Sequence, residues 1–149
     1  MPIHRGTPGI VPVPEQVVQA FEYDGQVPSA AVPPGWPEEV RPPGAPGWER
    51  TAVGWLLDRC PPEYRAHAVL TRHPAVLARF AAWHVEGAVA AARDGLSRAR
   101  VELGEVAGPE AVEAAVLALE REGARLAAAA RSVALVERAL RGERFLARL

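Results

Sequence analysis

The chain has 149 residues, of which 17 are basic and 18 are acidic, and its formal net charge at pH 7 is −1. A charge this close to zero gives no general electrostatic reason to expect nucleic acid or an anionic membrane as the partner. All the basic residues are arginine, a bias that GC-rich codons produce, so the arginine content alone does not indicate phosphate binding.

The cysteine content and the hydropathy both bear on the compartment. The single cysteine, Cys60, excludes an internal disulfide and is typical of a reducing compartment. No apolar run near the N-terminus is long enough for a signal peptide, and no stretch of about eighteen residues is apolar enough to span a bilayer. We therefore expect a cytoplasmic protein.

Residues 1–47 have the composition of a flexible arm. They contain eleven of the fifteen prolines and six of the thirteen glycines. Proline lacks an N–H and biases the preceding residue toward extended backbone, so we expect this arm to be largely disordered, sampling polyproline II and turns. Only residues 15–27 could form a short helix or a small hairpin. If the arm lies on a folded surface, its apolar contacts would be Val17, Val18, Phe21 and Tyr23.

Two short helices are predicted between residues 48 and 72, at the start of a helical domain that covers residues 48–149. Apolar residues recur at helical spacing after Gly47, which suits the N-cap, and this pattern ends at Pro61 and Pro62. Pro62 can occupy the first turn of a second short helix. That helix is expected to end before His73, because Pro74 suits the first turn of the next one.

The strongest pattern predicts a long antiparallel helical hairpin, formed by residues 74–103 and 109–141. Gly104 and Gly108 bound a five-residue connection, and Pro109 suits a first helical turn. The predicted contacts of the first helix are Val85, Val89, Ala92, Leu96, Ala99 and Leu103. Those of the second recur at every seventh residue and are Val112, Leu119, Leu126, Val133 and Leu140. The fold class is therefore all-α, an antiparallel coiled coil with the two short helices packed on it and the proline-rich arm before it.

Residues next to this heptad pattern refine the prediction. One turn further along the second helix stand Val116, Gly123, Ala130 and Glu137, so the middle of the contact is made of small side chains. Glu137 with Arg141, like Asp94 with Arg98, has the spacing of an exposed i, i+4 ion pair. Bulky apolar residues outside this contact must be buried by other parts of the protein. We expect the short helices to bury them at one end and a second copy of the chain to bury them elsewhere. These residues are Val76, Leu77, Phe80, Trp83, Leu117, Leu135 and Val136.

The titratable residues do not form a recognisable catalytic or metal-binding motif. His73 and His84 lie eleven residues apart and would share a helix face, but neither has a His, Asp, Glu or Cys three or four residues away. Cys60 and His67 are separated by two prolines, without a glycine-rich loop for an oxyanion. We expect no cofactor and no metal, and a structural or surface role for these histidines. An enzyme would require His84, Glu86 and Cys60 to converge in one pocket.

The aromatic residues between positions 48 and 83 indicate either a small core or a partner-binding patch. In the first interpretation they fill the space where the short helices dock on the long one. In the second, part of the cluster is exposed and binds a partner, with Trp36 of the arm able to join it. The partner-binding residues would then be Trp55, Tyr64, Phe80, Trp83 and His84.

The leading functional hypothesis is a non-enzymatic interaction or scaffold protein that self-associates, most simply as a homodimer, through its long hairpin. An alternative is a small regulatory protein that binds nucleic acid through its arginine-rich C-terminus, where four arginines follow position 137 with only one glutamate among them. That segment would be either a basic docking helix or the frayed end of the last helix. An enzyme or metal site around His84 is the third possibility.

Overall fold

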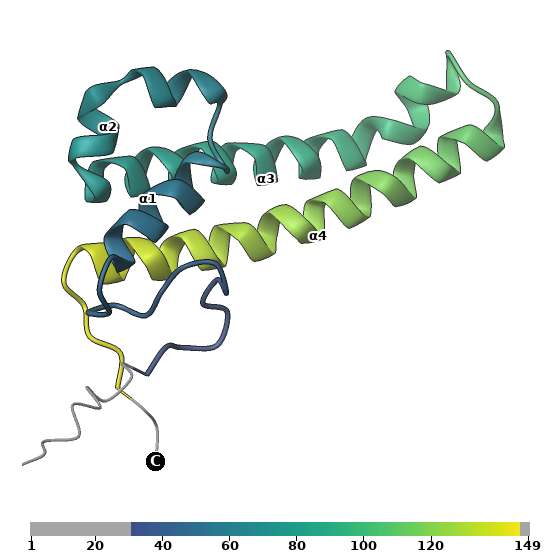
Figure 1. Cartoon of the computed structure of the whole chain (residues 1–149). Helices are drawn as coiled ribbons and strands as arrows, with labels where there is room; N and C mark the ends of the chain where they lie inside the picture. Colours follow the sequence, from purple (N-terminus) through teal and green to yellow (C-terminus); the bar gives the residue numbers. More distant parts are fainter. Residues whose placement is uncertain (1–30, 147–149) are drawn as a thin grey trace, which may run out of the picture.

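The computed structural model describes residues 31–146, and every regular element in this range is helical (Figure 1). The elements in chain order are α1 (Trp48–Leu57), the 3₁₀ helix η1 (Pro62–Ala66), α2 (Ala68–Arg72), α3 (Pro74–Gly104) and α4 (Pro109–Leu140). The all-α prediction is confirmed. Residues 15–27, for which a helix or a hairpin was considered, lie outside the described range.

The two long helices run antiparallel and side by side, as Figure 1 shows. With 31 residues in α3 and 32 in α4, each helix is about 47 Å long at 1.5 Å per residue. Both begin with a proline in the first turn, where the missing N–H has no intrahelical acceptor to lose. Gly108 is the N-cap of α4, so the helix boundaries follow the signals in the sequence.

The hydrophobic core lies at one end of this hairpin, which we call the base; we call the opposite end, around residues 104–108, the tip. At the base α1 packs on α3 and α4, and α2 packs on α3. The largest fully buried side chains here are Leu56, Leu70, Leu77, Val133 and Val136. Near the tip a separate, smaller cluster holds Ala99, Val112 and Val116. The short helices therefore cover only the base, and the part of the hairpin toward the tip consists of two helices alone.

Residues 31–47, which the composition assigned to the arm, lie on the helical body as a series of turns. Trp36 donates its indole N–H to the carbonyl of Val40 at 2.8 Å, and Val40 itself is buried. Ser132 of α4 donates its hydroxyl to the carbonyl of Gly35 at 2.8 Å. These contacts with α1 and α4 stabilise a segment whose local composition alone predicts no fixed conformation.

Residues 62–72 form two short helical pieces where one helix was expected. His67 between them has an extended backbone, with φ −93° and ψ 101°. In one continuous helix Tyr64 and Leu70, six residues apart, would point in directions about 120° apart at about 100° per residue. The break at His67 lets Leu70 enter the core while Tyr64 packs on Phe80.

The chain turns sharply after α4. Gly142 has a φ of 91°, a left-handed conformation that favours glycine, and its N–H donates to the carbonyl of Ala139. The next residues are not helical, and the Phe145 ring lies edge-on to Trp36 with 5.9 Å between the ring centroids. A C-terminal docking helix is therefore not formed by the described residues up to 146.

Candidate interaction surface

The predicted aromatic patch divides into an exposed part and a buried part. Tyr64 of η1 and Phe80 and Trp83 of α3 form one chain of ring contacts, with centroid distances of 5.8 Å and 5.6 Å. Trp83 is 58% exposed, and His84 beside it is exposed as well. Trp55 is buried elsewhere, beneath the Arg59 guanidinium, which lies 3.7 Å from the centroid of the indole ring. Of the five predicted contact residues, Trp55 therefore belongs to the core.

Trp36 does not join this aromatic group, because its ring packs against Phe145. Trp48 contributes at the edge of the core instead. The interpretation as a small core between the short helices and α3 thus holds for Tyr64 and Phe80, which are half-buried. Trp83 extends the same group into solvent.

The histidines and the cysteine lie in different environments. His73 occupies the N-cap position of α3 and is exposed like His84, whereas Cys60 is buried in the core. Burial raises the pKa of the Cys60 thiol, and the nearby Arg65 lowers it by a smaller amount. Within residues 31–146 no group of three or more His, Cys, Asp or Glu side chains is placed to hold a metal ion. Of the residues that an enzyme would require, the Cys60 thiol is buried and the His84 imidazole is exposed.

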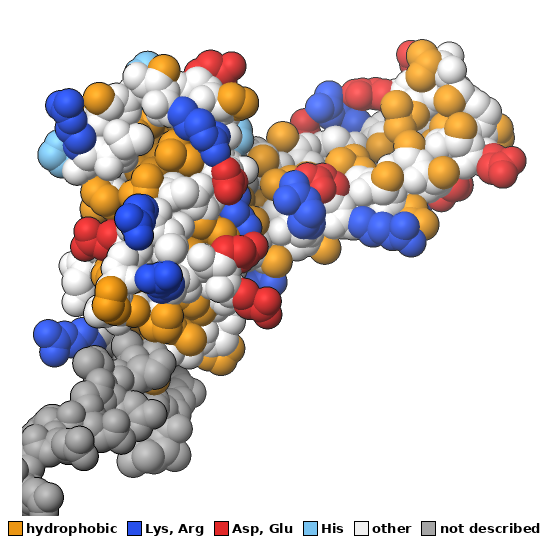
Figure 2. Space-filling view, viewed as in Figure 1, with side chains coloured by type: hydrophobic (Ala, Val, Ile, Leu, Met, Phe, Trp, Pro, Cys, Tyr) orange, Lys and Arg blue, Asp and Glu red, His pale blue; other side chains and the backbone are white. Residues whose placement is uncertain are grey.

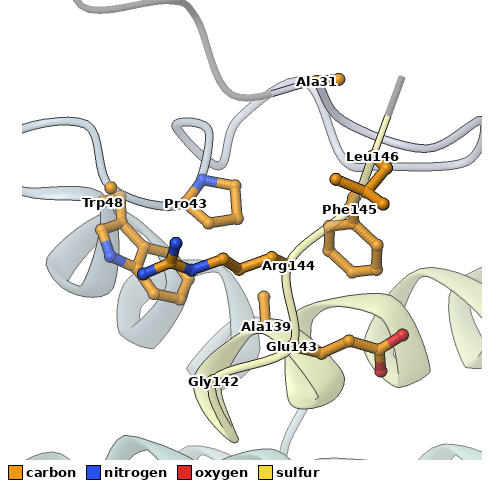
Figure 3. A pocket seen from close by; sticks show the side chains of 10 residues that line it. Ala31, Pro43, Trp48, Ala139, Gly142, Glu143, Arg144, Phe145 and Leu146 are labelled. Atoms are coloured by element: carbon orange, nitrogen blue, oxygen red, sulfur yellow. The ribbon is translucent and has the colours of Figure 1, made fainter.

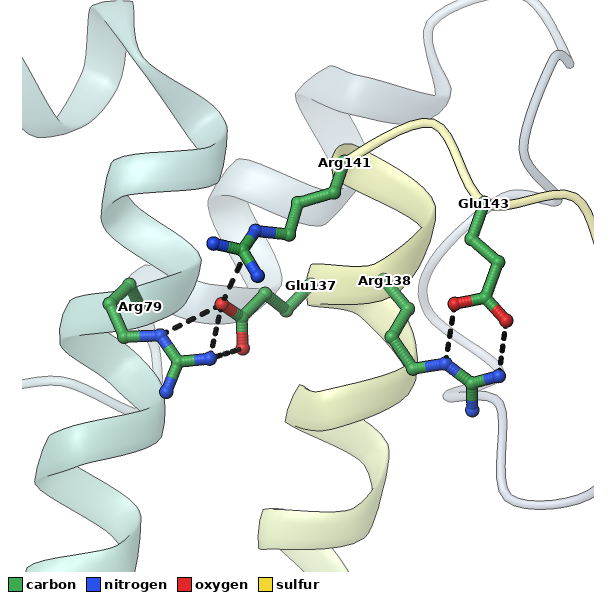
Figure 4. Close-up of polar contacts among 5 residues, drawn as sticks. All are labelled: Arg79, Glu137, Arg138, Arg141 and Glu143. Atoms are coloured by element: carbon green, nitrogen blue, oxygen red, sulfur yellow. Dashed lines mark hydrogen bonds and ion pairs between the residues drawn. The ribbon is translucent and has the colours of Figure 1, made fainter.

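A partly buried ion pair joins α3 to α4 at the base (Figure 4). Arg79 donates from Nε and Nη2 to Glu137, at 2.8 Å and 2.5 Å from Oε1 and at 2.5 Å from Oε2. Glu137 is only 5% exposed, and Arg141 Nε lies 3.9 Å from its Oε1. The predicted i, i+4 pair of Glu137 with Arg141 is present, but its expected exposed position is wrong, because Glu137 is buried and its main partner is Arg79 across the helix contact. The other expected pair, Asp94 with Arg98, is confirmed at 2.5 Å.

A second ion pair joins the two long helices near the tip. Arg100 donates from Nε and Nη2 to the two carboxylate oxygens of Glu113, at 3.0 Å and 3.2 Å. Both side chains are exposed. The hydrogen bond from Arg100 and its positive charge lower the pKa of Glu113. The hairpin is thus linked by an Arg–Glu pair at each end.

A groove runs along the hairpin between these two ion pairs. One hollow of about 310 Å³ is lined by Val89, Ala92, Arg93, Leu96, Gly123 and Ala127. Another, of about 350 Å³, is lined by Glu86, Val89, Ala90, Arg93, Ala127, Ala130 and Arg131. Three residues line both, so we treat the two hollows as one feature, the hairpin groove. Its cause is visible in the sequence: α4 places glycine and alanine where larger side chains would fill the space beside α3.

A further cavity of about 520 Å³ lies at the base (Figure 3). Its lining comes from the turns before α1, the first residue of α1, the end of α4 and the residues after it, including Pro43, Trp48 and Phe145. Ala31 and Leu146, the first and last residues that the structure describes, both line it. The Glu143 carboxylate at its edge accepts hydrogen bonds from Arg138, as Figure 4 shows.

The arginine-rich C-terminus directs part of its charge toward carboxylates of the same chain. Arg138 binds Glu143, and Arg141 approaches Glu137. The hypothesis of nucleic-acid binding through this segment gains no support from this arrangement, because guanidinium groups that already face carboxylates are less available to phosphates.

Comparisons with protein-family models, with curated proteins and with solved structures find no match to this chain. Among the described residues, no helix combines the length and the apolar character needed to cross a membrane.

Proposed function

We propose that this chain is a non-enzymatic interaction or scaffold protein that self-associates through its long helical hairpin. The observation that carries the proposal is the incomplete burial of the hairpin toward the tip. Large side chains of the heptad contact are only half-buried there; they are Val89, Leu96, Leu103, Leu119 and Leu126. Leu117 is 46% exposed and Val101 more so. On the face seen in Figure 2, hydrophobic side chains also reach the surface beyond the region that α1 and α2 cover.

The physical reason is that two helices cannot bury each other's apolar surface completely. Each helix presents an apolar stripe about 100° wide or more, and one neighbour covers only part of it. Burying apolar surface is worth about 25 cal/mol per Å², so covering the half-buried leucines favours association. A second hairpin supplies such a cover with side chains of the same kind and completes a four-helix arrangement.

The aromatic residues take different parts in this proposal. Trp83 and His84 are exposed and remain the predicted partner contacts; Phe80 packs against the Trp83 ring, and Tyr64 packs against Phe80. Large aromatic side chains at the edge of a core are common interaction anchors. A cytoplasmic location is part of the proposal and is supported by the free thiol of Cys60.

The test is the mass of the full-length chain in solution, measured by light scattering during size-exclusion chromatography over a range of concentrations. We expect the mass of a dimer, or a concentration-dependent approach to it. A monomeric mass at every concentration, with a compact hydrodynamic radius, would overturn the proposal. Binding of DNA or RNA that weakens steeply with added salt would favour the nucleic-acid alternative instead.

A further inference from the structure

We propose that two copies of the chain pair antiparallel through the hairpin groove, so that α3 of each copy lies along the groove of the other. The two-fold axis passes midway between Val89 and Ala90 of α3. This inference rests on the proposed self-association and names the surface that performs it.

The first support is that α1 lies on a different side of the hairpin. The cavity between α1 and α4 is lined on the α4 side by Arg125, Ala128 and Ala129. The hairpin groove uses Ala127 and Ala130, which lie on another side of the same helix. The short helices therefore leave the groove accessible to a second copy.

The second support is the charge pattern of α3 along the groove. Arg79 and Arg100 each pair with a glutamate of α4. Between them, Glu86 and Arg93 line the groove, and neither forms an ion pair with another of the described residues. They lie seven residues, or two helical turns, apart on the same side of α3. On α3 one acidic and one basic group thus remain available for a partner, and Arg131 of α4, which lines the same groove, is a second basic group outside the ion pairs among the described residues.

A two-fold axis between Val89 and Ala90 matches these charges. Glu86 and Arg93 lie at equal distances along the chain on either side of that axis. In an antiparallel pair, Glu86 of one copy therefore faces Arg93 of the other, and the symmetry forms this contact twice. Arg79 of one copy comes near Arg100 of the other, but each is already neutralised by the glutamate of its own α4.

The side chains at the axis are small. Ala90 is exposed and lines the groove together with Ala127 and Ala130 of α4, so a second copy can approach α3 closely there.

The decisive experiment reverses the two charges separately, as E86R and R93E. Each variant alone would place like charges at both symmetric contacts, which is strongly unfavourable across an interface. We therefore expect the dissociation constant of its dimer to be at least about tenfold higher than that of the wild-type dimer. A mixture of the two variants restores both attractions in a heterodimer, and so does the double variant E86R/R93E in a homodimer. Mass photometry or native mass spectrometry of differently tagged copies measures the populations.

A neighbouring pair of substitutions supplies the matched control. A90E introduces a carboxylate at the axis, whereas A91E introduces the same side chain on an exposed helical position that does not line the groove. We expect A90E to abolish the dimer and A91E to leave it intact. Circular dichroism shows whether both variants retain their helices.

The outcomes separate this inference from the proposed function. A wild-type chain that stays monomeric overturns both. A wild-type dimer that tolerates A90E, or single charge variants that dimerise alone as well as they do in the mixture, places the self-association on another surface and overturns the register proposed here.

Discussion

The Arg79–Glu137 pair at the base provides the sharpest test of how the two long helices are held together. Replacing Arg79 with methionine keeps most of the side-chain length but leaves the Glu137 carboxylate without its main partner. That carboxylate is 5% exposed, so water cannot replace the lost hydrogen bonds. Removing one partner of a buried ion pair costs about 3–5 kcal/mol.

Two features of the structure reduce this cost. The Arg79 side chain is itself 38% exposed, and Arg141 Nε lies 3.9 Å from the same carboxylate oxygen and keeps part of the attraction. We therefore expect R79M to lower the free energy of unfolding by about 2–3 kcal/mol. E137M should cost less, because the released guanidinium of Arg79 can reach water. The double variant R79M/E137M should recover most of the loss, since a methionine pair leaves no buried charge.

The assay is urea denaturation followed by circular dichroism, at one fixed protein concentration because association stabilises the folded state. R100M is the matched control: it removes the other Arg–Glu link between α3 and α4, in which both side chains are exposed. We expect R100M to shift the midpoint far less than R79M. If R79M and R100M unfold at the same urea concentration, burial of the Glu137 carboxylate does not govern the strength of this pair and the reasoning fails.

Further predictions concern the core, the helix glycines and the thiol. L77A removes a fully buried side chain and should lower the free energy of unfolding by about 2–5 kcal/mol in the same assay. G87A should raise the melting temperature, because an added Cβ meets no atom within 4 Å and alanine favours a helix over glycine by about 1 kcal/mol. G95A should raise it less, because its Cβ would lie 3.3 Å from Leu119 Cδ2. Burial raises the pKa of Cys60 above its usual 9.0, so the folded chain should react slowly with iodoacetamide. The unfolded chain loses the thiol proton at a lower pH than the folded chain, so the free energy of unfolding should fall as pH rises above that value and should be unaffected by this group below it. C60V should reduce this fall, measured by urea titrations at several pH values.

The long hairpin was predictable because its signals are local and repeated. The heptad from Val112 to Leu140, the prolines at both helix starts and the glycines of the connection all act within a few residues, and all agree. The same reasoning found the pair of Glu137 with Arg141 but missed the burial of Glu137, because its main partner, Arg79, lies 58 positions away in the sequence. A carboxylate in a helix contact and one on an exposed face have the same local pattern.

The fixed conformation of residues 31–47 could not be predicted from the sequence for a similar reason. Its proline content predicts no regular structure, and regular structure is absent among these residues. What holds them are distant contacts, such as the hydrogen bond from Ser132 to Gly35, 97 positions apart in the chain. The hairpin groove was predictable only in part. The sequence shows that Gly123 and Ala130 are small, but whether they leave a groove depends on which side chains of α3 lie beside them.

Ala31 and Leu146, the first and last residues that the structure describes, both line the cavity at the base, about 47 Å of helix away from the tip. The chain therefore enters and leaves the described helical body at the base. In the proposed antiparallel pair the two bases, each with its cavity, would lie at opposite ends of the paired hairpins and would be held apart by the length of the helices.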